Sequence, residues 1–416
     1  MLQTETAYTT SANTGKKYLI PFILVTSLFF LWGIANILNS ALIAHFQPVF
    51  QIGRAEALLV ETAFYLGYFF IAIPAGLFME KYSYKKGILT GLLLYAFGAL
   101  LFIPSAYMLT FGFFLIALFI IASGLAFLET AANPYVTILG SPETSVQRLN
   151  FAQSFNGVAL VVGPWIAGQF IFSGNEGAMS TLVEKQKAAE AVIFPYTLIA
   201  GAVLLVALLF FLAKMPEPAK TEKLKFDKSI FKNKHLMWAV FAQLLYVGAQ
   251  AGIWGITIDF IIELIPGTTR EVASKNFLVV GTFLFVIGRF LGTWLMTFIK
   301  DYKLLRMYGV MASLLCLTGV FAEGRIAVYA VLGTNFFMSI MFPTIFALGV
   351  KDLGEHTKLG SSFIIMAIVG GAILPPFMGL IADTVDIQQS FLLPALCFLA
   401  VIYYGWNGYK IKPAVA

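Results

Sequence analysis

Charged side chains are scarce in this sequence, and their scarcity excludes most soluble folds. Asp, Glu, Lys and Arg together make up 12% of the 416 residues, whereas soluble domains carry about 25%. Hydrophobic residues make up 59%. A chain with so few charges cannot cover a water-soluble globule of this size with polar side chains, so we expect an integral membrane protein.

Cysteine and histidine are rarer still. Cys316 and Cys397 lie inside apolar runs and lack the spacing of metal-binding or redox motifs. His45 and His235 lie near the ends of apolar runs, without a second ligand at useful spacing. The sequence also lacks the G-x-S-x-G, H-E-x-x-H and P-loop patterns. It therefore predicts no metal site, no cofactor and no enzymatic activity.

Long apolar runs dominate what is present. Twelve of them are long enough to cross a bilayer, which takes about 20 residues in a helix. The first is too long for the apolar core of a signal peptide, so we expect it to stay in the protein. The predicted spans are 19–45, 56–80, 86–104, 109–139, 149–173, 191–213, 236–264, 272–299, 304–322, 325–350, 359–383 and 387–408.

The spans fall into two groups of six. A polar segment at 214–234 separates 1–213 from 235–416 and predicts a cytoplasmic linker between two bundles. Local patterns recur between the halves at offsets of 209, 208 and 211 residues. Parallel repeats of this kind predict two pseudo-symmetric six-helix bundles, a midplane binding site where they meet, and alternating access. The recurring pairs are Pro134-x4-Leu139-Gly140 with Pro343-x4-Leu348-Gly349, Ser154-Phe155 with Ser362-Phe363, and Pro164-x3-Gly168 with Pro375-x3-Gly379.

The distribution of Lys and Arg predicts the orientation. If both termini are cytoplasmic, 20 of the 27 basic residues fall in the tails and inner loops and six in the outer loops, while Arg289 lies inside the membrane. This bias agrees with the positive-inside rule for an even number of spans. The net charge of +6 thus reflects topology and attraction to anionic lipid, and no nucleic-acid partner is expected.

One carboxylate stands out because it interrupts an apolar run of more than twenty residues that begins at Met108. A charge at membrane depth costs at least ~2.5–3.5 kcal/mol, so intramembrane acids usually line water, substrate or ion pathways. Glu129 is therefore the first candidate for a functional residue.

Five segments spread along nearly the whole chain carry a recognisable pattern. They are Phe30-Leu-Trp32-Gly-Ile-Ala-Asn36-Ile-Leu-Asn39-Ser40, Leu128-Glu129-Thr-Ala-Ala-Asn133-Pro134, Arg148-Leu-Asn-Phe-Ala-Gln153-Ser-Phe-Asn156, Tyr246-Val-Gly-Ala-Gln250 and Phe342-Pro343-Thr344-Ile-Phe. These segments resemble the fucose:proton symporter family of the major facilitator superfamily, which includes glucose/galactose transporters. The resemblance implies the twelve-helix major facilitator fold and sugar transport.

The resemblance also implies roles for particular residues. Glu129 matches the helix-four glutamate of proton-coupled substrate recognition. Gln153 and Asn156 match the sugar-contacting amides of helix five, and their spacing puts both on one helical face. Trp32 and Asn36 match the pattern of helix one.

Position 40 departs from the family pattern. The fucose symporters carry an aspartate there, whereas this chain has Ser40. A hydroxyl in place of a carboxylate removes one titratable group but keeps an oxygen. Three modes therefore stay open: proton symport through Glu129 alone, sodium symport with oxygen ligands from Asn36, Asn39 and Ser40, and uncoupled facilitated transport.

The chemistry of sugars favours the same kind of site. Sugar hydroxyls both donate and accept hydrogen bonds and sugar rings have apolar faces, so a site needs amides, carboxylates and aromatic rings. Beyond those named above, the predicted spans supply further candidates for substrate contacts, namely Asn39, Gln250, Trp254, Phe285 and Phe342.

Two other ionisable residues have two interpretations each. Glu61 either replaces the charge missing at position 40 or snorkels to water near a helix end. Arg289, well inside the eighth span, is either a structural residue at the inner gate or part of the site.

Together these observations predict a carrier in a bacterial plasma (inner) membrane, with both termini cytoplasmic. We expect a monomer that imports a neutral hexose, glucose or galactose before fucose. The expected partners are the sugar, a coupling ion and membrane lipid. The ion is expected to be a proton, with sodium coupling or an uncoupled facilitator as the alternatives.

Overall fold

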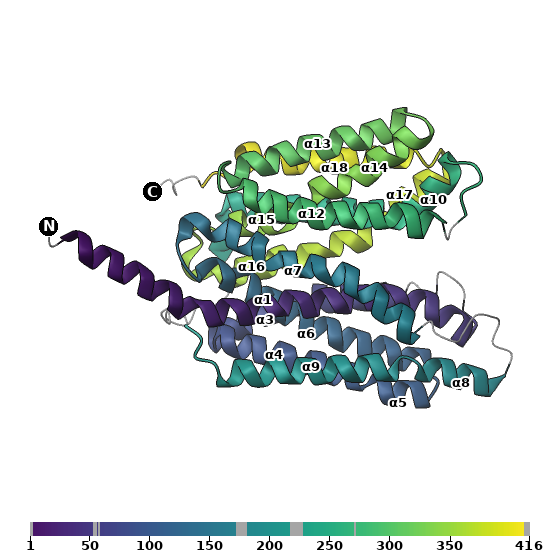
Figure 1. Ribbon diagram of the computed structural model, residues 1–416, viewed down its shortest axis with the longest axis horizontal. Helices are drawn as coiled ribbons and strands as arrows, with labels where there is room; N and C mark the ends of the chain where they lie inside the picture. Colours follow the sequence, from purple (N-terminus) through teal and green to yellow (C-terminus); the bar gives the residue numbers. More distant parts are fainter. Residues whose placement is uncertain are drawn as a thin grey trace. The chain divides into compact units, whose positions relative to one another are not determined.

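The protein is helical throughout the part of the chain that its structure describes. This computed structural model describes residues 3–52, 56, 59–171, 181–216, 228–269 and 272–411. Within these ranges the chain forms helices joined by short connections, and no strand occurs (Figure 1). The predicted all-α fold is confirmed.

Most of the predicted spans correspond to helices that can cross a membrane. Eleven stretches of the described residues are long and apolar enough to do so. The remaining predicted span, 149–173, corresponds to α7 (Ser145–Ile166) and one π-helical turn, η2 (Ala167–Ile171). The helix α7 carries several polar residues, and Asn150 and Gln153 among them are buried. Residues 172 and 173 lie outside the described residues.

Contacts along the chain separate it into two compact units. Unit 1 comprises residues 1–148 and 158–224, and unit 2 comprises residues 149–157 and 225–416. The middle of α7 therefore packs with unit 2, although its two ends belong to unit 1. Residues 217–227 of the predicted linker lie outside the described part of the chain.

Unit 1 is a bundle whose helices approach closely at glycines. A Cβ atom on Gly124 would lie only 2.6 Å from the backbone of Gly91 and of Tyr95, so α4 and α6 pack backbone to backbone. Besides the ends of α7, its helices are α1 (Gln3–Phe50), α3 (Leu59–Lys81), α4 (Tyr84–Leu100), α5 (Phe102–Tyr107), α6 (Phe111–Ile138), α8 (Leu182–Glu190) and α9 (Ile193–Leu212).

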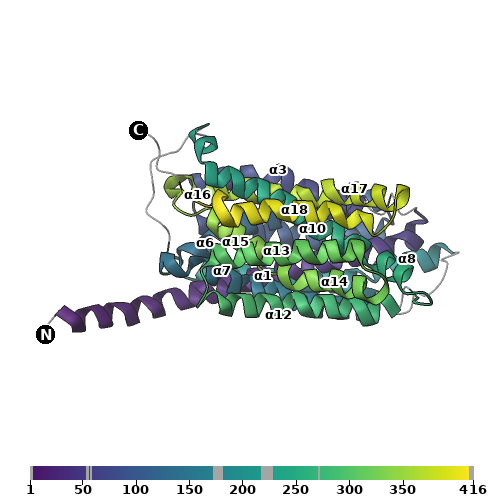
Figure 2. The same cartoon turned by 90° about the horizontal axis from the view of Figure 1, so that it is seen from above.

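Unit 2 is built in the same way. The backbone of α17 packs directly on that of α10, since a side chain at Gly370 would collide with the carbonyl of Leu244. Figure 2 shows the chain turned by 90° from the view of Figure 1, with α18, α13 and α12 of this unit labelled. Its helices are α10 (Lys234–Leu264), α12 (Val279–Leu295), α13 (Asp301–Phe321), α14 (Gly324–Met338), α15 (Met341–Gly349), α16 (Thr357–Met366), α17 (Gly370–Thr384) and α18 (Leu392–Tyr403), with π-helical segments η4 (Ala273–Leu278) and η8 (Tyr404–Gly408).

One predicted helix of unit 2 is broken. The span 325–350 divides at Ser339 and Ile340 into α14 and α15. Pro343 explains the break, because proline has no backbone N–H and its ring clashes with the carbonyl four residues earlier, here that of Ser339. The two carbonyls at the break, those of Met338 and Ser339, accept hydrogen bonds from side chains of other helices.

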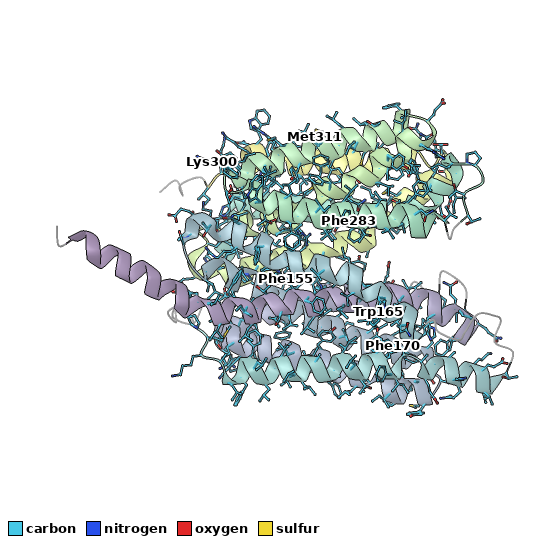
Figure 3. The ribbon with its side chains drawn as sticks, in the orientation of Figure 1. Phe155, Trp165, Phe170, Phe283, Lys300 and Met311 are labelled. Carbon is cyan, nitrogen blue, oxygen red and sulfur yellow. The ribbon has the colours of Figure 1, made fainter. Side chains whose placement is uncertain are left out.

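The outer surfaces of the helices are apolar, as membrane lipid requires. Phe283 on α12 and Met311 on α13 are 62% and 40% exposed, and both lie on the surface of unit 2 (Figure 3). Trp165 on α7 is 65% exposed. Side chains of this kind are expected to contact acyl chains, so their exposure does not mark a partner site.

Candidate functional site

Glu129 lies buried in the middle of unit 1. It is 2% exposed and is carried by α6. The hydroxyl of Tyr68 on α3 donates a hydrogen bond of 2.6 Å to Oε1 of the carboxyl group. The other oxygen, Oε2, is buried and has no hydrogen-bond partner among the described residues. Glu129 therefore has one oxygen held in place and one that can serve a proton or a ligand.

Local packing explains why α3 and α6 meet at this point. Gly67 lets the two helices approach, since a Cβ there would lie 2.6 Å from that of Ala122. Tyr68, the next residue, then reaches Glu129. On α6 itself the side-chain amide of Asn133 donates to the backbone carbonyl of Glu129 over 3.0 Å, which stabilises the turn before Pro134.

Helix α1 closes the cluster with an aromatic ring. The indole of Trp32 interacts with the Tyr68 hydroxyl. Tyr95 on α4 donates to the carbonyl of Leu31 over 3.1 Å and so fixes α1 beside the cluster. The structure thus brings together Trp32 and Glu129, which the sequence marks as separate candidates.

The remaining α1 candidates follow along the same helix. Asn36 donates to the carbonyl of Trp32 over 3.4 Å, one turn earlier. Asn39 is 5% exposed and its Oδ1 has no hydrogen-bond partner among the described residues. The side chain of Ser40 lies outside the described residues.

Glu61 lies apart from this cluster. It is half-buried in the first turn of α3, where a negative charge interacts favourably with the helix dipole. Seven residues separate it from Tyr68, which corresponds to about 10 Å along the helix axis. Its electrostatic neighbour is Tyr65.

A second polar cluster lies in unit 2 around Arg289. The guanidinium group is 3% exposed and donates from Nε to the carbonyl of Ser339 over 2.6 Å. From Nη1 it donates to the backbone carbonyl of Gln153 over 3.0 Å. It also lies over the ring of Phe285, 4.6 Å from its centroid. Arg289 therefore joins α12, the α14–α15 break and the middle of α7.

The break after α14 explains this use of arginine. Pro343 cannot supply the N–H that would bond the Ser339 carbonyl in a continuous helix, and Arg289 supplies it instead. The neighbouring carbonyl of Met338 accepts a 3.0 Å hydrogen bond from the hydroxyl of Tyr246 on α10. Both donors come from other helices, so tertiary contacts replace the missing helical ones.

The aromatic candidates of unit 2 lie beside this cluster. Trp254 donates from Nε1 to Oδ1 of Asn335 over 2.7 Å and packs edge-on against Phe285, with ring centroids 5.5 Å apart. It remains 42% exposed. The indole N–H is thus already bonded, while part of the ring stays accessible to a ligand or lipid.

The other unit 2 candidates differ in accessibility. Gln153 is 1% exposed and Phe342 is 7% exposed, so both are buried. Asn156 and Gln250 are half-buried. Gln250 interacts with the Tyr246 hydroxyl. Asn156 and Gln250 are therefore the more accessible amides of this unit.

Sequence reasoning missed two residues of these clusters. Tyr68 and Tyr246 each donate a hydrogen bond at the centre of their unit, yet a tyrosine in an apolar run usually indicates packing or a membrane interface. A weak signal existed for each: Tyr68 follows Gly67 in an otherwise apolar span, and Tyr246 precedes Gln250 by one turn.

No group of three or more His, Cys, Asp or Glu side chains that could hold a metal ion occurs within the described ranges. The polar atoms of the two clusters are a carboxylate, amides, hydroxyls, an indole and a guanidinium group. This donor set suits hydroxyl-rich ligands.

Comparison with known proteins agrees with this chemistry. The family model described as the Major Facilitator Superfamily matches residues 23–367. The L-fucose-proton symporter of Escherichia coli K12 is 42% identical over 413 residues, with 95% of this chain and 94% of that protein covered. A glucose/galactose transporter of Brucella abortus is 37% identical over 404 residues, with 96% and 97% covered.

A solved structure gives the same result at the level of the fold. The crystal structure of the E. coli fucose:proton symporter FucP superimposes with a TM-score of 0.86 at 42% sequence identity, and the match covers 94% of this chain and 99% of that one. The chain therefore belongs to the major facilitator superfamily and, within it, to the fucose:proton symporter family.

Proposed function

We propose that this protein is a secondary active transporter that imports a neutral hexose by alternating access, coupled to protons. Glu129 carries the proposal. A buried carboxyl group with one oxygen held by Tyr68 and the other without a partner can bind a proton and a sugar hydroxyl in turn. One such group suffices for a proton cycle, so the absence of aspartate at position 40 does not prevent it.

The substrate is proposed from the donor set and from the relatives. Amides, a carboxyl group and aromatic rings match the hydroxyls and apolar faces of a hexose. Two curated relatives are named L-fucose-proton symporters and two are named glucose/galactose transporters. We propose glucose or galactose before fucose. The proposed substrate contacts are Trp32, Asn36, Asn39, Ser40, Glu129, Gln153, Asn156, Gln250, Trp254, Phe285 and Phe342.

The membrane setting follows from the same reasoning. The bias of Lys and Arg supports a plasma membrane orientation with both termini and the 214–234 linker in the cytoplasm. We propose a monomer with two functional bundles, 1–213 and 235–416. Arg289 is proposed as a structural residue of the inner gate, because all of its described hydrogen bonds go to backbone carbonyls.

Sodium coupling is the second candidate, and Asn39 is the observation that favours it. Its buried Oδ1 has no hydrogen-bond partner among the described residues, and an amide oxygen is a ligand of the kind that hard cations prefer. A hydroxyl at position 40 would add another oxygen.

Uptake of labelled sugars into proteoliposomes tests both candidates. We expect accumulation of glucose or galactose under an imposed pH gradient with sodium absent, and a panel of competing sugars then ranks the substrates. Accumulation under a sodium gradient alone, with pH clamped, would replace the proton with sodium. Equilibration without accumulation under either gradient would identify a facilitator, and transport of amino acids or organic acids without hexose uptake would contradict the proposal.

Glu61→Gln should cause a milder defect than loss of the Glu129 charge. Glu61 is half-buried in the first turn of α3, away from the Tyr68–Glu129 pair, so we expect pH-driven uptake to fall by about threefold or less. The matched control is Glu56→Gln, because Glu56 is exposed and lies just before the same helix. Complete loss of pH-driven uptake in Glu61→Gln would instead make Glu61 a second coupling residue.

A further inference from the structure

The two oxygens of the Glu129 carboxyl group have different surroundings. Oε1 accepts the 2.6 Å hydrogen bond from Tyr68. Oε2 is buried and without a hydrogen-bond partner among the described residues. A phenol O–H can donate to Oε1 whether the carboxyl group is ionised or protonated, because in the protonated form Oε1 is the carbonyl oxygen. The geometry therefore favours Oε2 as the oxygen that carries the proton.

The position of Tyr68 is fixed by its neighbours. Its side chain is 1% exposed, and the close approach of α3 to α6 at Gly67 leaves no room for α3 to move toward Glu129. The indole of Trp32 on α1 lies beside the Tyr68 hydroxyl. Among the described residues, Tyr95 on α4 is the further titratable side chain that interacts with the Tyr68–Glu129 pair. The phenol is thus held in place before any ligand binds.

The second unit has a counterpart of this arrangement. Gly288 lets α12 approach α14, where a Cβ would collide with the carbonyl of Phe336. The residue after it, Arg289, donates to the carbonyl of Ser339, directly after the end of α14. In both units the residue that follows a close-approach glycine supplies the hydrogen-bond donor. Only in unit 1 is the acceptor a titratable side chain.

We propose that Tyr68 is a positioning residue for proton coupling, which fixes the Glu129 carboxyl group so that Oε2 alone takes up, presents and releases the transported proton. This inference rests on the proposed role of Glu129 as the coupling residue. Tyr68 keeps its own proton throughout the cycle. The transported proton binds Oε2, from which the carboxyl group donates to a sugar hydroxyl, and it leaves from the same atom.

Infrared spectroscopy of the reconstituted protein without sugar tests the hydrogen bond directly. The C=O stretching band of protonated Glu129 is identified by its disappearance in Glu129→Gln. In Tyr68→Phe we expect this band to move to higher frequency, because the carbonyl oxygen loses its donor. Tyr95→Phe is the matched control: it removes a phenol of the same size from the same bundle, but that phenol donates to the Leu31 carbonyl. In this control variant the C=O band of Glu129 should keep its wild-type frequency.

Transport measurements on the same variants test the coupling role. We expect Tyr68→Phe to slow pH-driven concentrative uptake by roughly tenfold or more, as expected when a hydrogen bond to an ionisable group is removed, while exchange of sugar across the membrane falls by much less. Tyr95→Phe removes the hydrogen bond to the Leu31 carbonyl and leaves the bond to Glu129 intact, so any loss should lower uptake and exchange equally. An unchanged band in Tyr68→Phe, equal shifts in both variants, or equal loss of uptake and exchange in Tyr68→Phe would each overturn the proposal.

A second variant covers the case in which Tyr68→Phe does not fold. Glu129→Asp leaves Tyr68 in place but withdraws the carboxyl group by one methylene, so its carbonyl band should also move to higher frequency. A band at the wild-type frequency in Glu129→Asp would count against the proposal. The infrared result does not depend on the substrate, so failure to transport hexoses would reject the proposed function and leave this measurement valid.

Discussion

Glu129→Gln should abolish concentrative sugar uptake while sugar exchange across the membrane continues. Glutamine has nearly the same shape as glutamate and still offers an Oε1 that can accept from Tyr68, so we expect the packing of the cluster to persist. It cannot release a proton. Concentrative uptake requires a full protonation cycle, whereas exchange of one sugar molecule for another requires none. The measurement is labelled sugar uptake into proteoliposomes with and without an imposed pH gradient, alongside exchange against internal unlabelled sugar.

The comparison between the two assays makes this result specific. We expect uptake by Glu129→Gln to match that of protein-free liposomes, with exchange retained to within about tenfold of the wild-type rate. Thr62→Ala is a suitable control, because Thr62 lies exposed on the first turn of α3. Retention of pH-driven accumulation by Glu129→Gln would show that another group carries the proton. Loss of both uptake and exchange would show that the charge itself binds the sugar.

Substitution of Arg289 should have the largest effect on stability. Arg289→Ala leaves two buried carbonyls, those of Ser339 and Gln153, without their donor. Each unsatisfied group costs about 1–3 kcal/mol, so the free energy of unfolding should fall by about 2–6 kcal/mol. Arg289→Lys should restore little, since an ammonium group on a single stem cannot reproduce the fork that reaches both carbonyls. Thermal unfolding in detergent checks this expectation, and for a chain of 416 residues the midpoint should fall by roughly 2–7 °C.

The control for this prediction is another arginine in the same unit. Arg325 is exposed in the first turn of α14, so Arg325→Ala should change the free energy of unfolding by less than about 0.5 kcal/mol. Full stability and full transport in Arg289→Ala would contradict a structural role at the inner gate. Full recovery by Arg289→Lys would mean that the positive charge matters and the two-carbonyl geometry does not.

Much of the fold was predictable because a bilayer imposes a simple rule on sequence. A helix that faces lipid must be apolar for about 20 residues, so the spans stand out without knowledge of their packing. The family is confirmed, and so is the major facilitator fold. Proline positions did not predict by themselves where a helix breaks. Pro134 lies within the continuous helix α6, whereas its repeat partner Pro343 accompanies a break, and the difference depends on donors that other helices supply.

The site was predictable only where a side chain is unusual by itself. Glu129 interrupts an apolar run, so it could be identified from the sequence, and its burial agrees with that interpretation. Tyr68 is one of 17 tyrosines, and its importance depends on which helix lies opposite Gly67. The acceptors of Arg289 are backbone carbonyls, which every residue possesses, so no pattern of side chains could indicate them. The roles assigned to the individual residues remain predictions.

Because Arg289 bonds to backbone acceptors, the two halves of the chain are expected to tolerate different substitutions during evolution. In unit 1 the donor and the acceptor are both side chains, Tyr68 and Glu129, so most replacements at either position break the pair and both codons are constrained together. In unit 2 the acceptor is the carbonyl of Ser339, which survives replacement of that side chain. Natural variation is therefore expected to spare both positions in the first half but only the arginine in the second.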